Sequence, residues 1–357
     1  MSDLPPSPFS DPSPWTPAPS PAAPPPPPVG LPGQPRLFEL RPLSLGEILD
    51  RTFSLYRQRF WLYTGLSTIT AGCASLFALA SLLLGRSKGL AAIFNPVAAA
   101  PPPQIRPEQI ARYGITFAVV IFVVMILYLV AYGVTQAATV AALSAVYVGE
   151  ETSIGIALKR VRGHWFRYIL IMMWQSWSGL WPFFVLIIPA IGFFAVPSLR
   201  GLGGLFIFLA FGALIYAPFA IIRNSLGVVS SAVEDLSVPK AMRRSKFLVS
   251  GHKARVLGIM LLVTVLGWVA GVLQQIVGTF AALTTGPAKI GLEALVLLVT
   301  FATTAMVTPV GPIAMTLFYI DERVRKEGFD LEVLMARGAQ APPGPDELPL
   351  PFTSELA

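Results

Sequence analysis

The chain has 357 residues, of which 54% are hydrophobic and 13% are charged, and its mean hydropathy is +0.66. A water-soluble globule carries about 25% charged residues, so this composition excludes a soluble domain and predicts an integral membrane protein. The net charge of +7 would suggest nucleic acid as the partner of a soluble protein. Here Lys and Arg gather at the ends of apolar runs, which favours anionic phospholipid over nucleic acid. These residues either recognise lipid or act only as topology signals.

Proline-rich tails are predicted at both ends of the chain. Residues 1–35 contain 15 prolines and almost no aliphatic side chains. Proline fixes φ and lacks an N–H group, so this segment cannot build a core and is expected to be disordered, with polyproline II character. It is either a solvated tail or a ligand for a proline-recognising domain. A second disordered tail is expected at 338–357, which leaves residues 36–337 as the membrane domain.

A motif of eight residues that opens with Ser and closes with Arg occurs three times, each time ahead of a long apolar run. The copies are residues 44–51, 153–160 and 237–244. Apolar residues stand one, four and five positions after the Ser, and these offsets place them on one helical face. Each copy therefore predicts a short amphipathic helix on the membrane surface.

The first copy has the clearest start signal. Ser44 and Glu47 fit a capping box, in which each side chain accepts a hydrogen bond from the backbone of the other residue. Leu43 and Ile48 fit the hydrophobic staple that flanks such a box. The helix is predicted to begin at Leu45.

Six apolar runs are long enough to cross a hydrocarbon core of about 30 Å. The second run is uncharged for 37 residues and would be about 55 Å long as one helix, so it either projects from the membrane or bends at Gly133. Small residues between Ala131 and Ala145 predict close helix packing along its second half. Prolines predict kinks in the third and sixth runs, loop residues are expected at 85–112, and a tight reversal is expected at 198–204. The predicted spans are 60–84, 113–149, 166–196, 205–222, 256–288 and 294–320.

The predicted fold is all-α: a polytopic membrane helix bundle of six transmembrane helices, arranged as three repeats of an amphipathic surface helix plus a helical hairpin. Chance recurrence of the short motif is the alternative to a common repeat origin. Six spans place both termini and all three motifs on one side, which then holds 20 Lys and Arg residues against 6 on the other. The positive-inside rule makes that side cytoplasmic.

No catalytic constellation is apparent in the sequence. The histidines, His164 and His252, lie in basic segments before spans, where they are either polar interfacial residues or headgroup ligands. Glu150 and Glu151 are interpreted as a boundary at the end of a span, and Cys73 stands alone in an apolar run. The sequence contains no metal-binding, phosphate-loop or nucleophile motif, and no charged residue is expected inside a span. We expect no enzyme activity, cofactor, metal or catalytic residue.

Two functions remain for such a bundle. Arg51, Arg160 and Arg244 occupy equivalent motif positions beside apolar faces, so they are candidates to bind anionic lipid headgroups or a protein partner. The alternative is a transporter or permease subunit, in which proline-broken spans enclose a polar cavity. Its candidate lining residues are Gln175, Thr304 and Thr308, although such side chains also form hydrogen bonds between helices.

Residues 41–57 and 321–332 resemble the two ends of a bacterial membrane-domain family named for glycerophosphoryl diester phosphodiesterases. The resemblance implies a six-helix domain of the bacterial cytoplasmic membrane with no assigned activity. The family takes its name from a soluble catalytic barrel to which some members are fused. No segment of this chain is long or polar enough to form that barrel, so the resemblance does not imply phosphodiesterase activity.

Overall fold

The computed structural model describes residues 43–85, 107–148, 150–328 and 335. The chain divides into two units, 1–37 and 38–357, and all described residues belong to the second. Their secondary structure is helical throughout, without a strand, which confirms the all-α prediction. Both predicted tails lie outside the described residues.

Six helical stretches of the described residues are long and apolar enough to cross a membrane, as predicted. This makes the chain a multi-pass membrane protein. The first, second, third and fifth stretches are formed by α2 (Phe60–Gly85), α4 (Pro107–Val148), α6 (Trp165–Ala195) and α11 (Lys253–Leu283). The fourth comprises a short 3-10 turn, η1 (Pro197–Leu199), followed by α7 (Arg200–Ala213), α8 (Tyr216–Asn224) and α9 (Gly227–Glu234). The sixth comprises α12 (Pro287–Val307) and α13 (Val310–Glu327).

Each motif forms a short helix that begins directly after its Ser, and these helices are α1 (Leu45–Gln58), α5 (Ile154–Arg162) and α10 (Val238–Val249). Ser44 and Glu47 form the predicted capping box. The Ser153 hydroxyl accepts a 3.4 Å bond from the N–H of Ile156. Ser237 makes no such bond, and Pro239 in the first turn of α10 helps to start that helix instead.

Two predicted loop boundaries are wrong. Residues 107–112 belong to α4, which runs as one helix to Val148 without a break at Gly133. Residues 200–204, expected in a reversal, form the first turns of α7. Gly203 allows α7 to pack closely against α6, because a Cβ atom at this position would lie 2.7 Å from the ring of Phe194 on α6.

Proline accounts for the breaks within two spans. Pro218 has no N–H group, so the carbonyl of Leu214 loses its usual helical donor; it accepts a 3.1 Å bond from Ala217 instead, where α7 gives way to α8. Pro309 stands between α12 and α13 as the N-cap residue of α13. Tyr56 of α1 then donates a 2.9 Å bond to the carbonyl of Met306 at the end of α12. By contrast, α6 continues as one helix through Pro182 and Pro189.

The core is centred on the second half of α4. Its small residues are buried, as predicted, and they allow α2, α6, α9 and α13 to pack closely around it. A Cβ atom at Gly133 would lie 3.6 Å from Met172 of α6. The buried small residues are Ala131, Ala137, Ala138, Ala141, Ala142 and Ala145.

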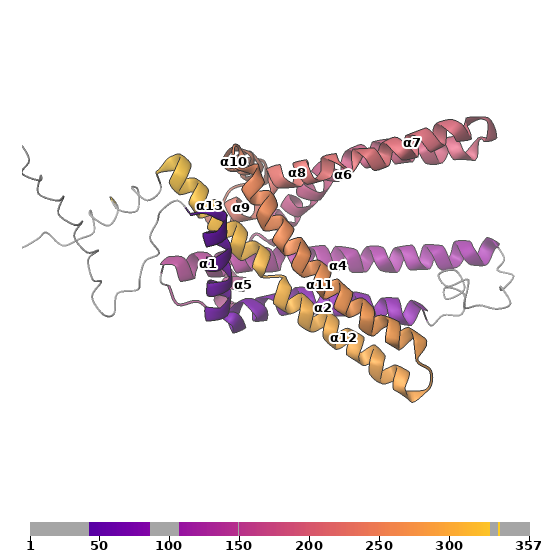
Figure 1. Cartoon of the computed structure of the whole chain (residues 1–357), viewed down its shortest axis with the longest axis horizontal. Helices are drawn as coiled ribbons and strands as arrows, with labels where there is room; N and C mark the ends of the chain where they lie inside the picture. The colour runs from indigo at the N-terminus through magenta and orange to yellow at the C-terminus, as the bar shows by residue number, and fades with distance from the viewer. Residues whose placement is uncertain (1–42, 86–106, 149, 329–334, 336–357) are drawn as a thin grey trace, which may run out of the picture. The chain divides into compact units, whose positions relative to one another are not determined.

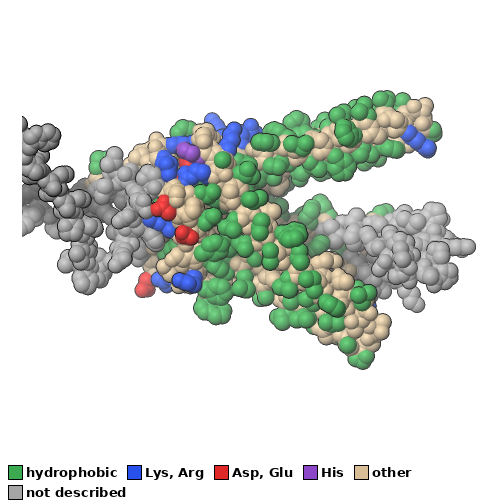
Figure 2. Space-filling view, viewed as in Figure 1, with side chains coloured by type: hydrophobic (Ala, Val, Ile, Leu, Met, Phe, Trp, Pro, Cys, Tyr) green, Lys and Arg blue, Asp and Glu red, His purple; other side chains and the backbone are tan. Residues whose placement is uncertain are grey.

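Charged and apolar side chains occupy different regions of the bundle. The helices α1, α5, α10 and the last two turns of α13 lie toward one end (Figure 1), where Lys, Arg, Asp and Glu gather (Figure 2). We call these four elements the charged end. Apolar side chains cover the long helices beyond it (Figure 2). In the most apolar segments of α6 and α11, only 11% of the residues are buried. Most side chains of these two helices are therefore available to lipid.

Candidate functional site

The charged end is held together by two carboxylates of α13, Asp321 and Glu322, whose side chains are completely buried. Asp321 accepts a 2.6 Å bond from the N–H of Leu43, just before α1, and it pairs with Arg255 of α11 at 2.7 Å. Arg325 approaches the same carboxylate at 3.0 Å. Both guanidinium groups also donate to the Leu43 carbonyl. Three elements distant in sequence therefore meet at Asp321.

Neighbouring groups complete this network. His252 Nδ1 lies 2.9 Å from the Glu322 carboxylate, so this histidine participates in an internal contact. Lys326 donates to the carbonyls of Phe247, Leu248 and Ser250 at the end of α10. A cation at that end compensates the negative pole of the helix dipole. The network therefore joins α13 to α1, α10 and α11.

A second network surrounds Arg244 of α10. Its guanidinium group binds Glu234 of α9 at 2.7 Å and also pairs with Glu327 of α13. Arg323 lies 3.2 Å from Glu327, and the Tyr319 hydroxyl donates to Glu234. The hydrogen bonds that Arg244 donates to Glu327 and Glu234 raise the pKa of Arg244, so this residue keeps its charge.

The three motif arginines all have partners within the chain. Arg51 forms a side-chain hydrogen bond with Tyr147 of α4, Arg160 binds Glu150 at 2.8 Å, and Arg244 lies in the network around Glu234. The sequence assigned these residues to lipid headgroups. Their observed contacts favour a structural role, because each guanidinium group already interacts with a group of this chain.

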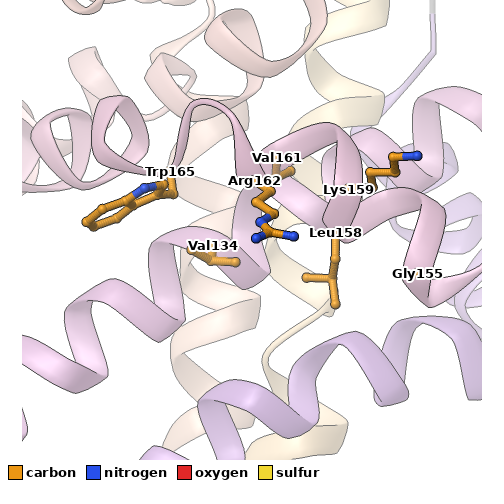
Figure 3. Close-up of a pocket in the computed structure, with 7 residues that line it drawn as sticks. All are labelled: Val134, Gly155, Leu158, Lys159, Val161, Arg162 and Trp165. Atoms are coloured by element: carbon orange, nitrogen blue, oxygen red, sulfur yellow. The ribbon is translucent and has the colours of Figure 1, made fainter.

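A cavity of about 510 Å³ lies beside α5, where this helix meets α4 and the start of α6. Arg160, the motif arginine of α5, is not among the residues that line it. Val134 of α4 and Leu158 of α5 form its apolar wall, and Trp165 stands at its margin (Figure 3). The Arg162 guanidinium group points between Val134 and Leu158 (Figure 3). The Lys159 side chain, on the same helix, points away from the Arg162 guanidinium group (Figure 3). Clefts of about 300–1,000 Å³ are typical of small-ligand sites.

The helical repeat explains why neighbouring cations of α5 have different environments. Lys159 and Arg162 are three residues apart and share a face, while Arg160 is turned about 100° from Lys159 and reaches Glu150. Both Lys159 and Arg162 are exposed. Within the described ranges, neither forms an ion pair. The cavity thus holds the Arg162 guanidinium group beside an apolar wall and the exposed Trp165, with Lys159 at its edge pointing outward.

The side chains proposed for a transport cavity lie in different packing groups. Gln175 of α6 donates a 2.6 Å bond to the carbonyl of Asn224, whose side chain donates to Ser178. Thr304 and Thr308 lie at the end of α12, and the Thr308 hydroxyl donates to the Thr304 carbonyl. Helix α6 packs mainly on α7, α8 and α4, whereas α12 packs mainly on α2 and α11. The structure does not bring Gln175 together with the two threonines.

One expectation about charge needs correction. No charged residue was expected inside a span, but Glu293 belongs to α12 and is only 7% exposed. The predicted start of the sixth span at residue 294 missed it by one position. Within the described part of the chain, no group of three His, Cys, Asp or Glu side chains could hold a metal ion.

Sequence reasoning missed the cationic face formed by Lys159 and Arg162. Lys159 lies in the second motif, residues 153–160, and Arg162 follows two positions after it, whereas the three motifs share only the Arg at their last position. The three-residue spacing of the pair, ahead of Trp165, was the available signal. Comparisons with models of known families, with curated proteins and with solved structures found no match.

Proposed function

We propose that the chain binds anionic phospholipid at the membrane surface, with the cavity beside α5 as the binding site. The supporting observation is the pair of exposed cations, Lys159 and Arg162, without an ion-pair partner in the described residues, next to an apolar wall. A lipid phosphate would lie by the cations, and an acyl chain would follow Val134 and Leu158 toward the hydrocarbon. Trp165 has the amphipathic ring that favours the headgroup depth.

In this proposal the charged end faces the cytoplasm of a bacterial cell, as its excess of Lys and Arg indicates. The cytoplasmic leaflet carries anionic lipid, and each Lys or Arg near such a surface contributes about 1 kcal/mol of attraction. The networks around Asp321 and Arg244 hold the surface helices in place. Membership of the membrane-domain family named for glycerophosphoryl diester phosphodiesterases stays a prediction, as does the lack of enzyme activity.

The test compares two double variants, each of which removes one Lys charge and one Arg charge, at different places in the chain. Lys159→Gln with Arg162→Gln neutralises the cavity, and Lys240→Gln with Arg243→Gln neutralises an exposed Lys and Arg of α10. We expect phosphatidylglycerol binding, measured by native mass spectrometry, to weaken about tenfold or more in the first variant, since two contacts of about 1 kcal/mol are lost. The second should retain most of its binding.

Equal losses in both variants would indicate attraction by overall charge without a site, and unchanged binding in the first would refute the site. A zwitterionic lipid of the same chain length is the ligand control. Its binding should respond to neither variant, because it lacks the net charge on which the proposal depends.

A further inference from the structure

A second cationic cleft lies between α8 and α11, away from the cavity beside α5. Its volume is about 230 Å³. The cations are Arg223 in the last turn of α8 and Lys253, the first residue of α11, and both are exposed. Among the residues that the structure describes, neither belongs to an ion pair. Asp321 and Glu322, which contact α11, pair with Arg255 of that helix.

The walls of this cleft become apolar with distance from the charges. Along α8, Tyr216, Phe219 and Arg223 are separated by three and four residues, so they share one helical face. Tyr216 lies seven residues, about 10 Å, from Arg223. On α11, Leu257 follows Lys253 by one turn and lines the same cleft. Both helices thus present a cation at one end of the cleft and apolar side chains at the other.

The change from charged to apolar walls along the cleft distinguishes an anionic lipid from a free anion as its ligand. A free phosphate would contact the two cations and leave the apolar walls unused. The cleft is smaller than the clefts of about 300–1,000 Å³ that enclose small ligands, so a larger ligand must extend out of it. Phe219 and Leu257 are 65% and 49% exposed, and they continue the cleft onto surface that faces lipid. An amphiphile with an anionic head matches both ends.

We propose that this cleft binds the phosphate group of one anionic phospholipid between Arg223 and Lys253, with an acyl chain along Phe219 and Leu257. The site differs from the cavity beside α5 in every residue. It lies between the fourth and the fifth span, so the bound lipid would contact helices from both.

The experiment uses the full chain in nanodiscs that contain phosphatidylglycerol. Arg223→Gln with Lys253→Gln should remove one tightly bound phosphatidylglycerol from the native mass spectrum and weaken its binding by about tenfold or more. The lipid at Lys159 and Arg162 should remain. The Lys240→Gln and Arg243→Gln variant, which loses one Lys and one Arg outside the cleft, should keep both lipids.

A second arm separates a lipid from a free anion. Phe219→Gln leaves both cations in place and should weaken phosphatidylglycerol binding, and excess inorganic phosphate should not displace the lipid. Displacement by phosphate, or full binding by the Phe219→Gln variant, would overturn the assignment to a lipid. An unchanged lipid count in the Arg223 and Lys253 variant would overturn the site itself. If that double variant does not accumulate, Lys253→Gln alone gives the same test, because this side chain is exposed.

Discussion

Asp321 shows how one side chain can organise the charged end. Its carboxylate is completely buried and interacts with Leu43, Arg255 and Arg325. The sequence indicated residues 321–332 as a charged segment after the last span and as one end of the family resemblance, but not as a buried network. Charge pattern alone cannot distinguish a solvated segment from a buried one, since the partners of Asp321 lie up to 278 positions away. The same limit applies to the ion pairs of Arg244 with Glu234 and Glu327, and lipid binding by Arg244 stays a prediction.

Replacing Asp321 should therefore destabilise the protein strongly. Asp321→Asn keeps the size of the side chain but leaves Arg255 and Arg325 without their shared counter-ion. Removing one partner of a buried pair typically costs about 3–5 kcal/mol. The free energy of unfolding, measured by denaturant titration in mixed micelles, checks this expectation.

Glu150→Gln is the matched control for that measurement. It removes a carboxylate from the pair with Arg160, in which both side chains are about half exposed, and exposed pairs contribute about 0–1 kcal/mol. A similar loss in the two variants would contradict the structural role assigned to Asp321.

At the scale of elements, local signals predicted the starts of helices better than their interruptions. The capping box at Ser44 and the motif Ser residues correctly placed the starts of α1, α5 and α10. The positions of prolines did not predict where helices break. Pro218 and Pro309 accompany breaks, whereas Pro182 lies inside a continuous helix. The presence of a proline in an apolar run therefore does not by itself predict whether the helix breaks or continues.

The break between α8 and α9 depends on a serine from another helix. The Ser245 hydroxyl of α10 donates to the Arg223 carbonyl at 3.1 Å and accepts from the Leu226 N–H at 3.0 Å. Ser245 is completely buried. Ser245→Ala should cost about 1–3 kcal/mol, because it leaves these buried backbone groups without their partner. Thermal unfolding in detergent provides the measurement.

The exposed Ser54 of α1 supplies the comparison, since Ser54→Ala loses only a surface contact with Gln58. We expect its unfolding temperature to stay close to that of the wild type. A Ser245→Ala variant as stable as Ser54→Ala would show that the break does not need this bridge.

At the scale of the molecule, composition and hydropathy were sufficient to predict six apolar spans and an all-α bundle. Alternation of apolar runs with basic motifs also predicted the three surface helices. The sequence could not predict which cations remain uncompensated, because this depends on helix rotation and on carboxylates from other elements. Arg160 reaches Glu150, whereas Lys159 and Arg162 remain available beside the cavity.

The account depends on all three surface helices lying at the cytoplasmic face, where anionic lipid is abundant. Single cysteines at Gln58, Glu151 and Lys240, in a Cys73→Ser background, can be tested in intact cells with a membrane-impermeant maleimide. A cysteine at Thr285, between α11 and α12, serves as the control for the opposite face. We predict that only the Thr285 position reacts before the cells are opened, and that the other three react afterwards. Reaction of any surface-helix cysteine in intact cells would contradict the account.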